Sequence, residues 1–149
     1  MKEYVTPIYY LGKKTYINIF YISDIIIYFH IKLNLRISLP RLLALLFFYK
    51  TRYDLPKQYK TAPPFEEDIE VKNNYVFIYD INRKYRKYKK ESLPISQIFF
   101  DKFEANIKTR SNLATKTAEY LVSTYASKND KELKKEVQNI LQNEKYIKY

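Results

Sequence analysis

The sequence predicts an α+β fold, a small domain of helices and strands with two C-terminal helices, preceded by an extended N-terminal arm over residues 1–15. Apolar residues recur at helical spacing in two segments near the N-terminus and two near the C-terminus. Residues 70–81 instead alternate between two faces, as a strand does. In the arm, Pro7 opposes a helix, and Gly12, the only glycine, marks a turn. Residues 16–149 then form one domain.

Two helices are expected after the arm. Ser23 or Asp24 can cap a helix that runs toward Arg36, with four apolar side chains on one face: Ile25, Ile26, Phe29 and Leu33. Pro40 suits the first turn of a second helix from residue 41 to about 52, which is apolar nearly all round and should be buried. His30 is interpreted as an ordinary, partly buried histidine and not as a catalyst.

The middle of the chain reads as a surface loop followed by a strand. Residues 53–67 hold three prolines and are expected to be a loop. The nearby acidic cluster lacks accompanying His or Cys, so we expect it to be solvated: Glu66, Glu67, Asp68 and Glu70. In the strand 70–81, one face carries Val76, Ile78 and Asp80, and the other carries Tyr75, Phe77, Tyr79 and Ile81. A second strand is expected over residues 95–103.

The C-terminal third predicts two helices. Ser111 can cap the first, whose apolar stripe comprises Ala114, Ala118, Leu121, Val122 and Tyr125. Asn129 and Glu132 have capping-box spacing at the start of the second. Its apolar stripe comprises Leu133, Val137, Ile140 and Leu141, whereas its lysines lie largely elsewhere.

A basic run over residues 82–90 is the strongest functional signal. Six of its nine residues are cationic, and the formal net charge of the chain is +11. Cations neutralise phosphates, and tyrosine rings can stack on unpaired bases, so the run indicates RNA binding. The alternative is a solvated hairpin or loop without a ligand. The candidate RNA-binding residues are Arg83, Lys84, Tyr85, Arg86, Lys87, Tyr88, Lys89 and Lys90, with Lys13, Lys14, Lys131, Lys134 and Lys135 elsewhere.

Composition argues against catalysis. A single glycine excludes glycine-rich phosphate loops, and the absence of cysteine excludes disulfides and cysteine zinc sites. No nucleophile–base set is evident, so we expect neither an enzyme, nor a cofactor, nor a metal site. The bias toward Tyr, Ile, Phe, Asn and Lys suits A+T-rich codons and an organellar, viral or parasite-like genome. No signal peptide is convincing.

Two apolar segments, residues 16–31 and 39–49, raise the question of a membrane. A bilayer span needs roughly 20 mostly apolar residues, and both segments are shorter. We therefore expect a buried strand or helix, and a membrane partner is disfavoured. The alternative keeps this region membrane-embedded, in an accessory subunit of a mitochondrial respiratory complex. A viral nucleic-acid-binding protein is a third interpretation.

Three short segments resemble the third small-subunit ribosomal protein family, of the KH-domain type. The chain opens with Val5-Thr6-Pro7-Ile8-Tyr9-Tyr10-Leu11-Gly12, similar to the family's opening segment. His30-Ile31-Lys32-Leu33-Asn34-Leu35-Arg36 is similar to the basic segment before the family's KH domain. Leu113-Ala114 through Tyr125, followed by Lys134-Lys135-Glu136-Val137-Gln138-Asn139, resembles its later helices. The matches cover about a third of the chain.

The resemblance implies a structural constituent of a small ribosomal subunit, and the A+T-rich composition suits a mitochondrial one, in the mitochondrial matrix. It implies ribosomal RNA and other ribosomal proteins as partners, including a separately encoded C-terminal half. It also implies that Lys131, Lys134 and Lys135 line the messenger entry channel. The chain departs from the family in lacking the Gly-x-x-Gly loop of a KH domain. The expected domain is therefore a degenerate KH-like one, with the basic run as a substitute anchor.

Overall fold

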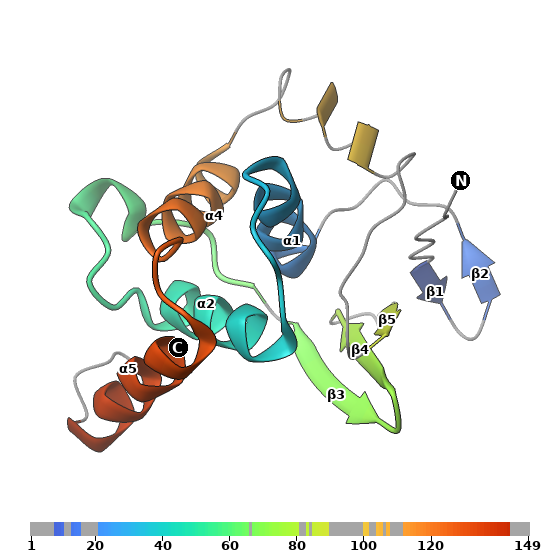
Figure 1. Ribbon diagram of the computed structural model, residues 1–149. Coiled ribbons are helices and arrows are strands. Elements are labelled where there is room, and N and C mark those ends of the chain that lie inside the picture. The colour runs from blue at the N-terminus through green and yellow to red at the C-terminus, as the bar shows by residue number, and fades with distance from the viewer. Residues whose placement is uncertain are drawn as a thin grey trace.

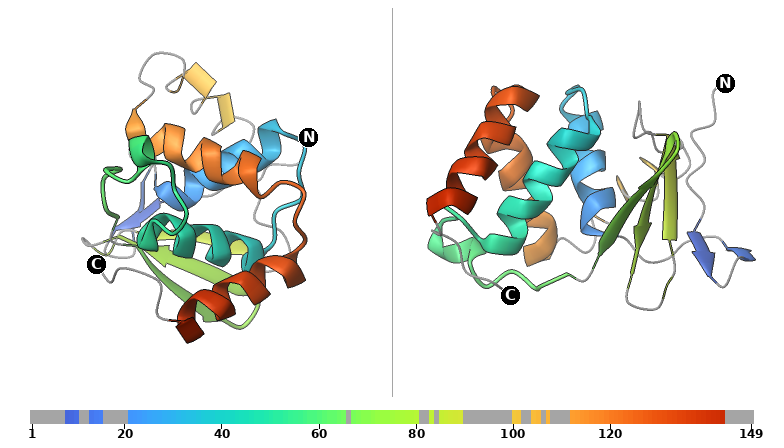
Figure 2. Two further views of the ribbon diagram at one scale, coloured as in Figure 1. Left: turned by 90° about the vertical axis from the view of Figure 1, so that its left-hand side faces the viewer. Right: turned by 90° about the horizontal axis from the view of Figure 1, so that it is seen from below.

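The protein has an α+β architecture in which a helical layer packs against one face of an antiparallel sheet (Figures 1 and 2). The computed structural model describes residues 8–10, 13–15, 21–65, 67–80, 83, 85–89, 100–101, 104–105, 107 and 112–143. The predicted α+β class and the two C-terminal helices are confirmed. Extended backbone is also confirmed for the described parts of the N-terminal arm.

The sheet has five strands in the order β2-β1-β5-β4-β3, and the adjacent strands are antiparallel. Their bounds are β1 Ile8–Tyr10, β2 Lys13–Thr15, β3 Asp68–Lys72, β4 Tyr75–Tyr79 and β5 Tyr85–Lys89. The N-terminal arm therefore adds two strands to the sheet through the pairing of β1 with β5. Along each strand, successive residues lie on opposite faces of the sheet, and residues paired across two strands lie on the same face.

The strand predicted over residues 70–81 is in fact a hairpin. Lys72 pairs with Tyr75, so Asn73 and Asn74 form the turn between β3 and β4. Asn73 has a φ of 55°, which asparagine tolerates better than most residues. The strand predicted over residues 95–103 is wrong where it can be examined, because Phe100 and Asp101 are helical. Residues 91–99 lie outside the described part of the chain.

The two N-terminal helices lie close to their predicted places. Helix α1 spans Ile22–Lys32, and helix α2 spans Leu39–Thr51 with Pro40 in its first turn. The N-cap of α1 is Tyr21 and neither of the two predicted residues, but Asp24 takes part in the cap, because its carboxylate accepts a hydrogen bond from the Tyr21 amide at 3.2 Å. The helix stops before Arg36, because Asn34 adopts a left-handed φ of 55°. At α2, the Ser38 hydroxyl accepts a hydrogen bond from the Arg41 amide.

Helix α4 spans Leu113–Thr124, and helix α5 spans Asp130–Asn143. The side chain of Asn112 caps α4 by accepting from the Thr115 amide at 2.9 Å, whereas the predicted cap, Ser111, lies outside the described residues. The capping box of α5 is confirmed: each of Asn129 and Glu132 accepts a hydrogen bond from the amide of the other. Leu141, predicted to be in the apolar stripe, is 46% exposed.

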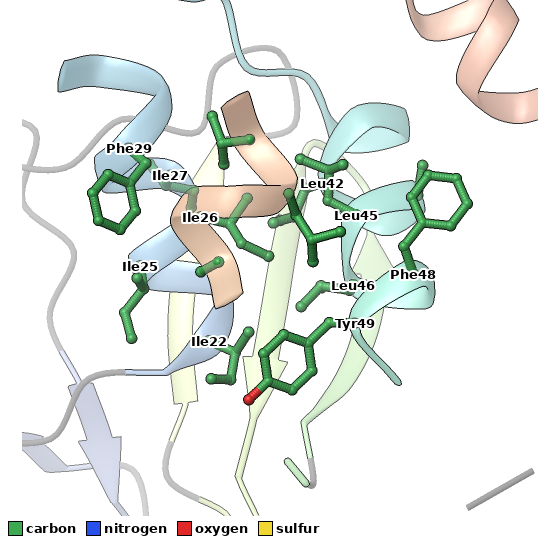
Figure 3. Packing of buried hydrophobic residues seen from close by; sticks show 14 of the residues in the cluster. Ile22, Ile25, Ile26, Ile27, Phe29, Leu42, Leu45, Leu46, Phe48 and Tyr49 are labelled. Atoms are coloured by element: carbon green, nitrogen blue, oxygen red, sulfur yellow. The ribbon is translucent and has the colours of Figure 1, made fainter. Parts of the chain in front are cut away.

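The hydrophobic core lies between the helices and extends to the sheet (Figure 3). Helices α1 and α2 supply most of it, including the fully buried Ile26, Ile27, Leu42 and Leu45. Helix α2 is not buried all round as predicted, since Leu43 is 42% exposed. Over the described residues, no helix has both the length and the apolar character needed to cross a membrane.

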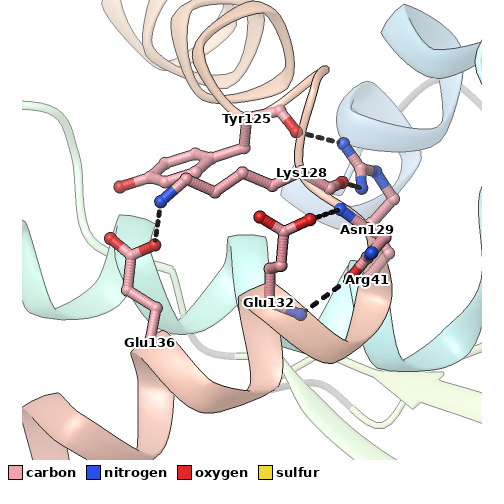
Figure 4. A network of polar contacts seen from close by, with 6 residues as sticks. All are labelled: Arg41, Tyr125, Lys128, Asn129, Glu132 and Glu136. Carbon is pink, nitrogen blue, oxygen red and sulfur yellow. Dashed lines mark hydrogen bonds and ion pairs between the residues drawn. The ribbon is translucent and has the colours of Figure 1, made fainter.

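A buried polar network ties α2 to its neighbours (Figure 4). The Arg41 guanidinium donates to the carbonyl oxygens of Tyr125 and Lys128 in the turn between α4 and α5. Its Nε–H donates to Nε2 of His30 at 2.9 Å, so the Nδ1–H of His30 donates to the Ile26 carbonyl at 2.7 Å. Burial lowers the pKa of His30 to about 4 and keeps the ring neutral. This histidine is thus a fully buried structural residue.

Within the acidic cluster, Glu67 contradicts the expectation of a solvated loop, whereas Asp68 and Glu70 are exposed on β3 and Glu66 lies outside the described residues. The Glu67 carboxylate accepts hydrogen bonds from the amides of Ile22 and Ser23, at 2.8 and 3.2 Å, and from the Ser23 hydroxyl at 2.6 Å. A carboxylate at this place is stabilised by the free amides and the positive end of the helix dipole. Glu67 therefore fastens the segment before β3 to the start of α1.

Candidate nucleic-acid interface

The central part of the basic run forms a strand. Residues Tyr85–Lys89 make β5, which lies between β1 and β4 in the sheet. The three charged or aromatic positions on one face are Tyr85, Lys87 and Lys89. They stand opposite Tyr79, Phe77 and Tyr75 of β4. The pairing of these two strands therefore brings the cations of one beside the aromatic residues of the other.

The two faces of the sheet differ sharply in character. Val76 and Ile78 of β4 are completely buried against the helices. On the other face, Tyr75 is 38% exposed, and Phe77 and Tyr79 are half-buried. We call this second face the aromatic face, defined by Lys72, Tyr75, Phe77, Tyr79, Tyr85 and Lys87. The predicted alternation of residues 75–79 between two faces is confirmed.

Three rings form the centre of the aromatic face. The Tyr79 and Tyr85 ring centroids are 5.3 Å apart, and those of Phe77 and Tyr85 are 5.5 Å apart. The Phe77 and Tyr79 rings are nearly parallel, with an interplanar angle of 18°. By the strand register, Tyr9 of β1 stands opposite Tyr85. The three described rings come from two adjacent strands, β4 and β5.

Cations lie over these rings. The Lys87 ammonium is 4.2 Å from the centroid of Tyr75 and 5.8 Å from that of Phe77. The Arg83 guanidinium is 4.3 Å from the Tyr79 centroid, and Arg83 as a residue is exposed. Such cation–π contacts hold the charges at the surface of the sheet. Arg83 and Lys87 thus lie along the protein surface, where a polyanion could reach them.

The charge on the aromatic face changes sign across the sheet. On β3, Asp68 stands opposite Tyr79, and Glu70 stands opposite Phe77. Glu70 forms an exposed ion pair with Lys72 at 3.1 Å. At the other edge, the register places Lys14 of β2 opposite Tyr9. The rings of β4 therefore lie between a border with two carboxylates on β3 and the Lys87 cation of β5.

The structure describes the remaining predicted RNA-binding residues to different extents. Arg86, Tyr88 and Lys89 are placed by the backbone of β5, and Lys13 and Lys14 by that of β2. Lys84 and Lys90 lie outside the described residues. Of the group 83–90, Arg83, Tyr85 and Lys87 therefore lie on one face or its rim. Lys89 occupies a strand position of the same parity as Tyr85, and Arg86 and Tyr88 occupy positions of the opposite parity.

The lysines of α5 are exposed, as expected, but they do not join the aromatic face. Lys131, Lys134 and Lys135 are all solvent-accessible, and helix α5 lies on the opposite side of α1 and α2 from the sheet (Figure 2). Helix α5 also carries three acidic residues, Asp130, Glu132 and Glu136, which balance its three lysines. Its surface is consequently less suited to a polyanion than the aromatic face.

Sequence reasoning missed the contribution of β4 and β3 to this surface. Tyr75, Phe77 and Tyr79 were placed on one strand face, but without a functional role. The sequence contained two separate signals for this surface: the alternating aromatic residues 75–79 and the basic run 82–90 that follows them. Only the hairpin-like pairing of β4 with β5 joins the parts, because it puts Lys87 directly opposite Phe77.

Within the described residues, no group of three or more His, Cys, Asp or Glu side chains could hold a metal ion. The aromatic face is thus the site with the clearest chemical character in the described structure. It offers ring surfaces for stacking and fixed cations for phosphate. No known protein family, curated protein or solved structure matches this chain.

Proposed function

We propose that this protein is an RNA-binding structural constituent of a small ribosomal subunit, of the mitochondrial type. The observation that carries the RNA-binding part is the aromatic face, where Arg83 and Lys87 lie over the rings of β4. Ring surfaces and cations at such short range are the two components of sequence-tolerant RNA binding. The ribosomal part is supported by the resemblance of three segments to the third small-subunit family. The net charge of +11 supports both parts.

The role is structural in this proposal, without a catalytic step. RNA phosphates would lie on the cations of β5, whose positions are set by the sheet backbone. Binding by phosphate contact fixes the protein on RNA without reading much sequence. A ribosomal protein needs this property, because it must hold RNA segments in one arrangement.

The first prediction tests RNA binding with paired double variants of the full chain. Arg83→Ala with Lys87→Ala should weaken RNA binding and flatten its salt dependence, by roughly 0.7 to 0.9 in the log–log slope per lost phosphate contact. The matched control, Lys131→Ala with Lys134→Ala, removes the same charge from α5 and should change the affinity much less. Fluorescence anisotropy at a series of salt concentrations measures both.

An equal loss of affinity in the two double variants would show that net charge alone drives binding. If the unaltered chain showed no salt-dependent binding to RNA, the RNA-binding role would be refuted.

The ribosomal part of the proposal is tested by cell fractionation. Native protein from mitochondria should co-sediment with small ribosomal subunits. Recovery in a detergent-solubilised membrane complex would instead support the alternative of a respiratory-complex subunit.

A further inference from the structure

The aromatic face carries more ring surface than phosphate binding requires. Lysines and arginines alone can neutralise a backbone, as they do at most contacts with duplex phosphates. Here the rings of Phe77, Tyr79 and Tyr85 form a contiguous cluster with centroid separations of 5.3 to 6.2 Å. They lie on the sheet face opposite the core, and Tyr75 beside them is 38% exposed. This arrangement calls for a ligand that offers flat surfaces together with negative charge.

The geometry points to a single-stranded RNA segment on the aromatic face, with unpaired bases stacked on the row of Tyr79 and Tyr85. This inference rests on the proposed RNA-binding function and specifies its ligand. Bases within a duplex present only their edges to a protein, so only unpaired bases can stack on the rings. A four-stranded or larger sheet can present aromatic side chains to roughly two or three bases in this way.

The cations already packed on the rings are compatible with such a ligand. The Arg83 guanidinium lies 4.3 Å from the Tyr79 centroid, and its outer face remains available because Arg83 is exposed. A guanidinium plane can itself stack on a base, or it can turn to a phosphate. Lys87 of β5 lies over the ring of Tyr75 of β4 and adds positive charge beside the other rings.

The distribution of charge also sets an orientation for the strand. Phosphates are attracted to the cations of β5 and repelled by Asp68 and Glu70 on β3. The sugar–phosphate backbone therefore runs over the β5 side, and the bases extend across β4 toward β3. Asp68 stands opposite Tyr79, so a base on Tyr79 brings its edge toward this carboxylate.

The orientation has a consequence for base preference. An ionised carboxylate only accepts hydrogen bonds. Cytosine offers an amino donor at the position where uracil has a carbonyl oxygen, and the two bases are otherwise alike in size and stacking area. Asp68 should therefore favour cytosine over uracil by about tenfold, the lower end of the value of one hydrogen bond to a charged group.

The test uses the full chain and three RNA probes of about ten nucleotides or base pairs: oligocytidylate, oligouridylate and a duplex. We expect the single strands to bind about tenfold more tightly than the duplex. Tyr79→Leu with Tyr85→Leu should remove most of this preference, and Tyr79→Phe with Tyr85→Phe should keep it. Asp68→Asn should bring cytidylate and uridylate close to equal affinity.

Ultraviolet cross-linking of the unaltered chain to a single strand gives a second readout that does not depend on how variants fold. Cross-links should map to peptides that contain Tyr79 or Tyr85. Duplex binding as tight as single-strand binding, or cross-links confined to α5, would overturn the inference while RNA binding itself stands. Equal affinity of the unaltered chain for the two oligomers would overturn the orientation. Absence of any RNA binding would remove the proposed function as well.

Discussion

Glu67 shows how the surroundings of a single residue decide its role. Its carboxylate accepts three hydrogen bonds from the first residues of α1, so it works as a helix cap supplied from a distant segment. Burial, the largest cause, together with the nearby Asp24 raises its pKa to about 7, although the hydrogen bonds from Ser23 and Ile22 act in the opposite direction. The cap thus titrates near neutral pH.

This pKa leads to a prediction about stability and pH. Between the unfolded value of 4.5 and the folded value of about 7, the folded chain holds the Glu67 proton more tightly than the unfolded chain. The contribution of Glu67 to the free energy of unfolding is therefore complete below pH 4.5 and declines as the pH rises to about 7. In Glu67→Gln, which cannot titrate, this decline should disappear. Chemical denaturation at a series of pH values measures the difference between the two proteins.

His30 does not disturb this comparison. Its pKa is lowered to about 4, so its own contribution to stability is lost as the pH falls from 6.5 through 4. Both proteins carry His30, and it cancels when their unfolding free energies are subtracted. A difference between the two proteins that is independent of pH would contradict the assigned role of Glu67.

At the scale of elements, the scarcity of glycine shapes the turns and helix ends. Among the described residues, left-handed φ values, which glycine usually supplies, occur at Asn34, Arg52, Asp54, Asn73 and Arg83. Asparagine and aspartate tolerate this region, so three of the five positions carry a suitable residue. Arg52 ends α2 in this conformation. Hairpins and helix ends can consequently form in a chain with one glycine.

The β3–β4 turn allows a matched test of this explanation. Asn73→Ala should lower the free energy of unfolding by about 1 kcal/mol, because alanine is strained at positive φ. Asn74→Ala, the next residue in the same turn, has no positive φ to lose and should have a smaller effect. Thermal or urea unfolding of both variants measures the difference, and equal effects would show that φ at residue 73 does not limit the hairpin.

At the scale of the whole molecule, the two cationic surfaces face different ways. The aromatic face lies on the sheet, and the lysines of α5 lie on the opposite side of α1 and α2 (Figure 2). A short RNA segment cannot cover both. In an assembled particle, the aromatic face and α5 would therefore contact different segments, or α5 would face something other than RNA.

The resemblance places α5 at the messenger entry channel, and this remains a prediction. Replacing Lys131, Lys134 and Lys135 by alanine should leave binding of isolated RNA to the aromatic face within about twofold, because salt screens charges that lie more than about 10 Å apart. In assembled particles, the same variant should weaken the hold on incoming messenger RNA. The location of α5 in a particle decides the point, and lysines far from any RNA path would remove both the channel role and the register taken from Val137-Gln138-Asn139.

Local features of the sequence determined much of the secondary structure. Helical spacing located α1, α2, α4 and α5, because the pattern of apolar residues and the helix depend on the same 3.6-residue period. The capping box of Asn129 and Glu132 could also be predicted, because all its groups lie within four residues of the sequence. The basic run and the aromatic alternation were also recognisable separately.

Only the tertiary structure decided which distant residues meet. The Arg41 guanidinium reaches carbonyl groups 84 and 87 residues away, and Glu67 caps a helix 45 residues earlier. The pairing of β5 between β1 and β4 likewise makes the basic run part of a sheet surface. Such contacts depend on strand register and packing, which arise from the whole core, and no local spacing encodes them. The residues of the candidate interface could therefore be read from the sequence, but their arrangement as one aromatic and cationic face could not.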